Sequence, residues 1–202
     1  MKKFITLILV IIVTASITYI AVPRPYMVHW HANFAVYMDG KQRDFSGPSY
    51  MEEVSRCNVT EWVLPQDRIH LHDGKWDLVH VHMAASTWGD LFANLYMGIG
   101  ETYLSDGYGE VFQTGSGKSL YYILNGKKID NPRNLIVESE DRLLVWYGTG
   151  TAEEVIEKFD THVVKTAHEY NGKADPASCS SNVYWPFGGI IDRVKEFLPH
   201  SH

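Results

Sequence analysis

Alternating apolar and polar residues in the first half of the chain predict strands joined by tight turns. Residues 28–38 alternate between apolar residues and a polar set that includes His29 and His31. Asp39-Gly40 follows, and this dipeptide is typical of type I′ hairpin turns, so the chain is expected to return as a strand over residues 41–45. His29 and His31 then lie at the open end of this hairpin, away from its turn.

A second alternating segment predicts a hairpin that carries four histidines. His70 and His72 precede a turn-like segment, and His80 and His82 follow it. Because alternate side chains on a strand share one face, each His-x-His pair presents both rings on the same side. If the two strands fold about Trp76, His72 lies opposite His80 and His70 lies opposite His82.

Two capping boxes predict where helices begin. Thr87 and Thr151 are each followed three residues later by an acidic residue, which is the pattern that caps a helix N-terminus. The first box is expected to open a helix through residue 96. The second is expected to open a single helix whose apolar residues recur at helical spacing through Ala167. A short amphipathic helix over residues 190–198 closes the chain.

Further short apolar segments complete the predicted sheet. Residues 120–124 and 127–129 flank Asn125-Gly126, a second type I′ turn signal. Residues 135–137 and 143–147 are predicted to be two more strands. The expected fold class is therefore α+β, with a mixed sheet of hairpins and flanking helices.

Glycine, proline and small polar residues predict a long connection. Residues 46–67 are expected to form a loop with one short helix near residues 50–55. The Gly-rich residues 97–118 are expected to end the helix that Thr87 opens, and residues 115–119 are expected to be a surface loop.

The order of a hairpin, a helix and later strands is similar to the ubiquitin-like β-grasp fold over residues 68–150. Thr87-Trp88-Gly89-Asp90-Leu91 resembles the helix start of sulfur-carrier members, and Leu124-Asn125-Gly126-Lys127 and Glu140-Asp141-Arg142-Leu143 resemble their later strands. The resemblance implies a β-grasp-like core. Sulfur carriers act through a terminal Gly-Gly, whereas Gly148-Thr149-Gly150 runs straight into a predicted helix, so their activity is not expected here.

An uncharged segment, residues 4–22, follows Met1-Lys2-Lys3. As a helix it would be roughly 28 Å long, close to the thickness of a bilayer's hydrocarbon core, and this predicts an N-terminal transmembrane helix. The alternative is a cleaved signal peptide. In both cases the later residues face outside the cytoplasm.

These patterns predict three parts of the chain. Residues 1–25 form the anchor and a spacer, and residues 26–150 form a His-rich extracytoplasmic domain. Residues 151–202 form a helical extension that packs on this domain.

Charge makes nucleic acid an unsuitable partner for the region beyond residue 22. Without Lys2 and Lys3, 16 of the 18 basic residues remain against 24 acidic residues, which is a net charge of about −8. Binding to a phosphate backbone depends on clustered Lys and Arg. An acidic surface attracts cations instead.

Cys57 and Cys179 are the two cysteines of the chain. An even number outside the cytoplasm predicts one disulfide, which in the chain-entropy model would stabilise the fold by on the order of 4 to 5 kcal/mol. The alternatives are two unpaired thiols or a thiolate within a metal site.

Six of the ten histidines occur as three His-x-His pairs. This repeated spacing predicts a site for one or two transition-metal ions, Zn or Cu, because imidazole suits both. The alternative is a polar histidine network or a pH-responsive face. The predicted ligands are His29, His31, His70, His72, His80 and His82.

Asp73 and Asp77 border the turn between the second and third pairs. They are either acceptors that orient the imidazole N–H groups of the ligands or ordinary turn residues.

The leading hypothesis is a membrane-anchored protein that binds a transition metal for sensing, storage or delivery. A metal-dependent enzyme, either a zinc hydrolase or a copper oxidoreductase, is the first alternative. Neither a His-Glu-x-x-His nor a Gly-x-Ser-x-Gly string occurs, and the sequence identifies no catalytic residue or protein partner. The second alternative is a cell-surface interaction module without metal.

Overall fold

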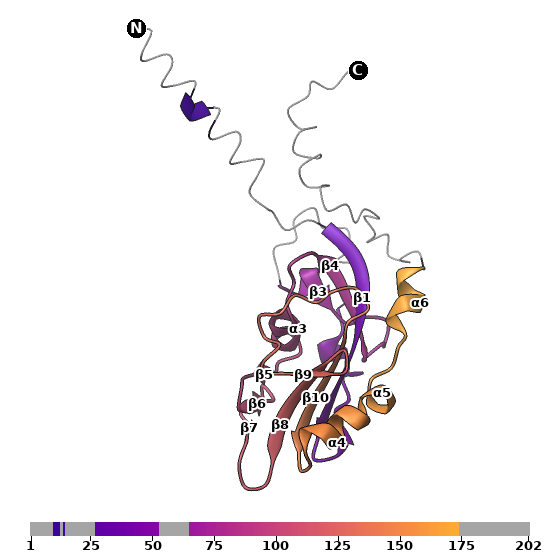
Figure 1. Ribbon diagram of the computed structural model, residues 1–202. Helices are drawn as coiled ribbons and strands as arrows, with labels where there is room; N and C mark the ends of the chain where they lie inside the picture. The colour runs from indigo at the N-terminus through magenta and orange to yellow at the C-terminus, as the bar shows by residue number, and fades with distance from the viewer. Residues whose placement is uncertain (1–9, 13, 15–26, 53–64, 174–202) are drawn as a thin grey trace. The chain divides into compact units, whose positions relative to one another are not determined.

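The computed structural model describes residues 10–12, 14, 27–52 and 65–173 (Figure 1). The chain divides into two compact units, Met1–Tyr26 with Asn182–His202, and Met27–Ser181. Every helix and strand named below belongs to the unit Met27–Ser181.

A mixed seven-stranded sheet forms the framework of this unit. Its strands follow the order β3-β4-β1-β10-β8-β9, and β2 also pairs with β1. β1 and β10 are parallel, whereas the other neighbouring pairs are antiparallel. The predicted α+β class with a mixed sheet is therefore confirmed. The strands are β1 (Met27–Met38), β2 (Lys41–Gln42), β3 (Ile69–His70), β4 (Leu78–Met83), β8 (Ser119–Leu124), β9 (Lys127–Ile129) and β10 (Arg142–Gly148).

Two of the predicted turns have the backbone that their sequences require. Asp39 and Gly40 have φ values of 51° and 77°, and Asn125 and Gly126 have values of 51° and 78°. Positive φ at both central residues defines the type I′ turn. The first hairpin is confirmed, although its returning strand β2 has only two residues.

The β3–β4 hairpin is present, but its predicted register was wrong by two residues. His70 pairs with His80 rather than with His82. The reason is the turn, which is built at Asp73 and Gly74, both with positive φ, instead of at Trp76. A shift of two residues leaves each side chain on its original face, so the four histidines still share one face.

The two faces of the sheet pack against different helices. On one face the ring of Phe34 lies 5.5 Å from that of Phe45 and 6.0 Å from that of Phe92 in α3 (Trp88–Asn94). On the other face Leu144 packs with Phe159 and the helices that follow β10, drawn in orange in Figure 1. These helices are α4 (Ala152–Glu157), α5 (Phe159–His162) and α6 (Ala167–Asn171).

Both capping boxes are confirmed. The Thr87 and Thr151 side chains each accept a hydrogen bond from the backbone of the third helical residue, whose own carboxylate accepts one in return. Each box therefore satisfies two backbone donors at a helix start.

The predicted single helix beyond Thr151 was wrong, because the chain leaves the helical conformation between α5 and α6. Arg142 of β10 donates hydrogen bonds to the carbonyl oxygens of Val163 and Val164, the latter at 3.1 Å. Its guanidinium also donates to the Asp160 carboxylate at 2.6 Å. Val163, whose carbonyl oxygen Arg142 binds, has an extended backbone.

Other short segments hold structure that the sequence pattern did not predict. Residues 97–118 include a three-stranded sheet, β5 (Gly98–Ile99), β6 (Tyr103–Ser105) and β7 (Val111–Gln113). Strands of two or three residues are too short to show an alternating pattern. Residues 135–137 make one isolated bridge, between Ile136 and Thr87, rather than a strand. The described part of residues 46–67 holds the 3₁₀ helix η1 (Pro48–Tyr50) and α2 (Pro65–Arg68).

The elements that carry the β-grasp resemblance occur in the expected order. The β3–β4 hairpin precedes α3, and β8, β9 and β10 follow. β1, which precedes the matched region, lies between β4 and β10 in the sheet. The family resemblance itself stays a prediction.

Several predictions concern residues that the structure does not describe. Among the described residues, no helix is both long and apolar enough to span a membrane. Most of residues 4–22 lies outside the described ranges, as do Cys57, Cys179 and residues 190–198. The anchor, the disulfide, the last helix and the three-part division of the chain stay predictions.

Replacing Arg142 by Lys is expected to lower the free energy of unfolding by about 1 to 3 kcal/mol, because an ammonium cannot reproduce the planar fork that holds two carbonyl groups. Urea denaturation followed by tryptophan fluorescence measures this difference. Lys165→Ala is the matched control, since Lys165 pairs with the same Asp160 but is 67% exposed. Equal effects of the two substitutions would contradict the role assigned to Arg142.

Candidate metal centre

The six predicted histidines meet on one face of the sheet, where β3, β4 and β1 lie side by side. His31 lies directly opposite His80, and His80 lies directly opposite His70. Five of the rings are buried, and the sixth, that of His29, is partly buried. The antiparallel pairing of three strands therefore brings together histidines that are up to 53 residues apart, from His29 to His82.

The six histidines form two groups of three. The β1 group consists of His29, His31 and His80, and the β3 group consists of His70, His72 and His82. Within each group the three candidate ligand atoms lie within 4.8 Å of one another. β4 lies between β1 and β3, and its two histidines belong to different groups. His80 belongs to the β1 group, and His82 belongs to the β3 group.

The two groups touch one another. The ring centroids of His72 and His80 are 3.4 Å apart, and those of His29 and His82 are 5.5 Å apart. The six rings therefore make one continuous array with two ligand sets.

An outer acceptor orients His31 in the β1 group. The Nδ1 atom of His31 lies 2.8 Å from the side-chain oxygen of Asn171 in α6, and the backbone N–H of His31 donates to the same oxygen at 2.8 Å. With its proton on Nδ1, the ring directs Nε2 toward His80, whose Nδ1 lies 3.0 Å away. Asn171 thus selects the tautomer that faces the group.

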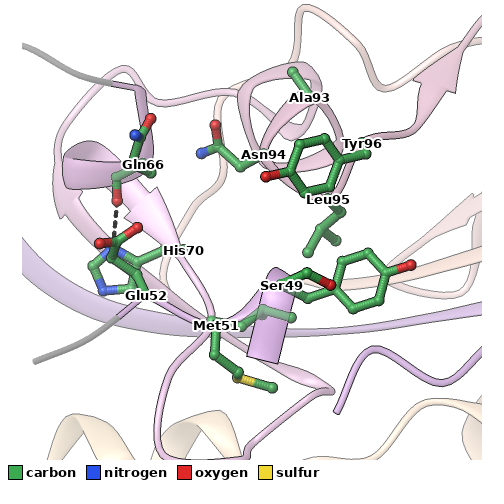
Figure 2. Close-up of a pocket in the computed structure, with 11 residues that line it drawn as sticks. Ser49, Met51, Glu52, Gln66, His70, Ala93, Asn94, Leu95 and Tyr96 are labelled. Atoms are coloured by element: carbon green, nitrogen blue, oxygen red, sulfur yellow. Dashed lines mark hydrogen bonds between the residues drawn. The ribbon is translucent and has the colours of Figure 1, made fainter. Parts of the chain in front are cut away.

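An outer acceptor also lies beside one histidine of the β3 group. The Nδ1 atom of His72 lies 3.0 Å from a carboxylate oxygen of Asp73 without forming a hydrogen bond. The Nδ1 atom of His70 donates to the backbone carbonyl oxygen of Gln66 at 2.5 Å, the bond drawn as a dashed line in Figure 2. Metal-bound histidines commonly donate their second ring N–H to such a carbonyl or carboxylate, and this leaves Nε2 for the ion.

The two turn aspartates are placed differently. The Asp73 carboxylate lies 3.0 Å from the Nδ1 atom of His72. Asp77 instead offers its backbone carbonyl oxygen to the Asn33 side chain at 3.1 Å and to the Phe34 N–H at 3.2 Å. Their roles toward a metal stay predictions.

Asn33 attaches α6 to the sheet beside the histidines. It is fully buried on β1, and its side-chain oxygen accepts from the N–H groups of Thr166 and Ala167 at 3.0 and 2.9 Å. Its side-chain nitrogen donates to the Thr166 hydroxyl at 2.9 Å. These bonds satisfy the first backbone donors of α6, and the helix in turn carries Asn171 to His31.

Burial keeps two histidines of the array, both on β4, in the neutral form. Desolvation, followed by the charges of His72 and His31, lowers the pKa of His80 well below its ordinary value of 6.5. Desolvation, followed by the charges of His70 and His29, lowers the pKa of His82 to about 2. A metal ion binds the neutral form of imidazole, so both rings stay in the ligating state at neutral pH.

A cavity of about 300 Å³ borders the β3 group (Figure 2). His70 forms part of its wall, and Glu52 places a carboxylate beside it. The other walls come from η1 and the residue after it, from α2, and from the last turn of α3. The lining residues are Ser49, Tyr50, Met51, Glu52, Gln66, His70, Leu71, Ala93, Asn94, Leu95 and Tyr96.

The remaining described histidines have other contacts. The ring of His162 packs against those of Tyr37 and Trp146, at 4.3 and 5.9 Å between centroids. His168 pairs with Glu140 at 2.9 Å on the surface. His200 and His202 lie outside the described residues.

Comparison of the chain with protein-family models, curated proteins and solved structures gives no match. The ligands themselves indicate the chemistry of the site. Three imidazoles suit Zn, Cu, Ni or Fe, and they leave a tetrahedral ion one position for another ligand.

The metal-free protein is expected to lose stability as the pH falls below about 6.5. Above that pH His80 and His82 are neutral in the folded and in the unfolded chain. Below it, these two histidines bind protons in the unfolded chain but not in the folded chain. The loss approaches about 1.4 kcal/mol per pH unit for each such histidine. Urea denaturation with a chelator at pH 7.5, 6.0 and 5.0 measures it. His82→Gln should reduce the slope and His168→Ala should not, and a flat profile would contradict the assignment.

Replacing Asn171 by Leu is expected to weaken metal binding at the β1 group by about 10- to 100-fold, because His31 loses the acceptor that orients its ring. Asn171→Asp, which keeps an acceptor oxygen, is the matched control and should retain the affinity. Competition with a chromogenic chelator, in a background of His70→Ala and His72→Ala, isolates the β1 group. Equal losses of metal affinity in both variants would contradict the role assigned to the acceptor oxygen of Asn171.

Proposed function

We propose that this chain is an extracytoplasmic protein that binds two transition-metal ions, one in each histidine group, for sensing, storage or delivery. The observation that carries this proposal is the convergence of six imidazoles into two sets of three, five of the rings buried. Burying polar rings is unfavourable unless they are bonded, and an ion satisfies three of them at once.

The oriented rings favour metal binding over a purely structural histidine network. In both groups an acceptor lies beside Nδ1 and directs Nε2 inward: Asn171 for His31, and the Gln66 carbonyl for His70. Zn and Cu are the proposed ions, since imidazole is a ligand for both. The same convergence argues against an interaction module without metal, which would have no use for buried, inward-facing imidazoles.

The proposed location comes from the sequence. The uncharged residues 4–22 would tether the protein to the membrane, and a Cys57–Cys179 disulfide would suit an oxidising compartment. The acidic balance of the rest of the chain would attract cations to the site. A β-grasp-like core is the proposed scaffold for these features.

A metal-dependent enzyme is the second candidate function. One observation favours it, namely the cavity that His70 and Glu52 share. An ion next to a cavity that contains a carboxylate is an arrangement that hydrolytic metal sites use. Binding and catalysis differ in whether a further molecule can reach the ion.

The full chain is expected to bind two Zn²⁺ or Cu⁺ ions, measured by elemental analysis after removal of excess metal. A His200→Ala, His202→Ala background removes adventitious binding by the C-terminal histidines. In this background, His29→Ala with His31→Ala, or His70→Ala with His72→Ala, should each leave one ion.

His162→Ala with His168→Ala is the matched control for histidine loss, and it should retain both ions. An unchanged metal content in the two group variants, or the absence of metal from the parent protein, would refute the proposed function.

A further inference from the structure

The two histidine groups differ in what lies next to them. The β1 group lies beneath α6, where Asn171 contacts His31 and the ring of Tyr170 lies 5.8 Å from that of His31. The β3 group lies at the opposite side of the array, and its member His70 borders the cavity. Within the described residues, α6 therefore contacts the β1 group, whereas the β3 group borders a cavity.

The cavity wall at the β3 group is built by backbone pairing. The Glu52 N–H donates to the carbonyl oxygen of Leu71 at 2.8 Å, and Met51 forms a parallel bridge with Leu71. Leu71 stands between two ligands of the group, so this pairing holds the Glu52 carboxylate next to them. On the far wall the Asn94 side chain donates to the Ile69 carbonyl oxygen at 2.8 Å, which fixes the end of α3 against β3.

The chemistry of the wall restricts what the cavity can hold. Its lining residues include hydroxyl groups, amides and one carboxylate, and they include no Lys or Arg. An anion would find no counter-charge on these residues and would meet the carboxylate of Glu52. A volume of about 300 Å³ equals that of roughly ten water molecules. A cation would be repelled by a metal ion bound at the β3 group, so the cavity suits a small uncharged molecule.

We propose that the β3 group is an open metal centre, whose ion keeps one coordination position that faces the cavity. A small uncharged molecule with a nitrogen or oxygen donor enters the cavity and completes the coordination of this ion. The β1 group holds the other ion beneath α6. Three protein ligands with a further position for water or substrate is the arrangement of catalytic zinc sites. This inference rests on the proposed metal binding.

Imidazole and Co²⁺ provide the probes, because imidazole is a small uncharged nitrogen donor and the visible absorption of Co²⁺ reports its ligands. The full chain is loaded with Co²⁺, its metal content is measured, and imidazole is added. We expect a saturable spectral change that persists in His29→Ala with His31→Ala. The change should be absent from His70→Ala with His72→Ala, although that variant still holds one ion.

A substitution that fills the cavity tests whether imidazole reaches the ion through it, because such a substitution leaves the metal ligands in place. Ala93 is exposed and lines the cavity, so Ala93→Trp should weaken imidazole binding at least tenfold and leave the Co²⁺ content unchanged. Glu157→Trp, at an exposed position on α4, is the matched control and should bind imidazole like the parent protein.

The possible failures are distinguishable. Protein that binds no Co²⁺ overturns the proposed function itself. Protein that binds two ions but shows no response to imidazole, or that responds only through the β1 group, overturns the open centre and leaves metal binding in place. An Ala93→Trp variant with unchanged imidazole affinity overturns the cavity as the route.

Discussion

The antiparallel pairing of β1 with β4 is the interaction on which the rest of this structure depends. It sets His31 directly opposite His80, and the pairing of β4 with β3 adds His70 to the same row. β1 also pairs with β10 in parallel from Asn33 onward, and the carbonyl oxygen of His31 accepts from the Glu140 N–H at 2.8 Å. The strand that carries two of the histidines is therefore bonded on both sides from His31 onward.

The array is a compromise between stability and chemistry. Apolar side chains at the same buried positions would avoid the desolvation of six imidazoles, and natural proteins violate such packing rules mainly at functional sites. Polar contacts in the surrounding structure hold the elements next to the buried rings in place. Asn33 secures α6, α6 supplies Asn171, and Arg142 breaks the helical path so that α6 can reach the sheet.

Sequence and structure agree where the information is local. Asp39-Gly40 and Asn125-Gly126 form type I′ turns, and Thr87 and Thr151 form capping boxes, because each of these features is decided by residues within four positions of one another. The helix predicted beyond Thr151 failed for the opposite reason. Arg142, which lies 21 residues before Val163, takes the carbonyl oxygen that a continuous helix would have used, and helical spacing alone contains no sign of that contact.

By itself the sequence determined that the two histidines of each His-x-His pair lie on one side of their strand, since the period of two in a strand fixes the face of each side chain. It did not determine the strand order, the register or the division into two groups. Those were decided by tertiary structure, because β1 is inserted between β4 and β10 and the β4 pair is shared between its neighbours. The outer partners Asn171 and Gln66 were likewise invisible in the sequence. Asn171 is 140 residues from His31, and Gln66 contributes a backbone carbonyl that any residue carries.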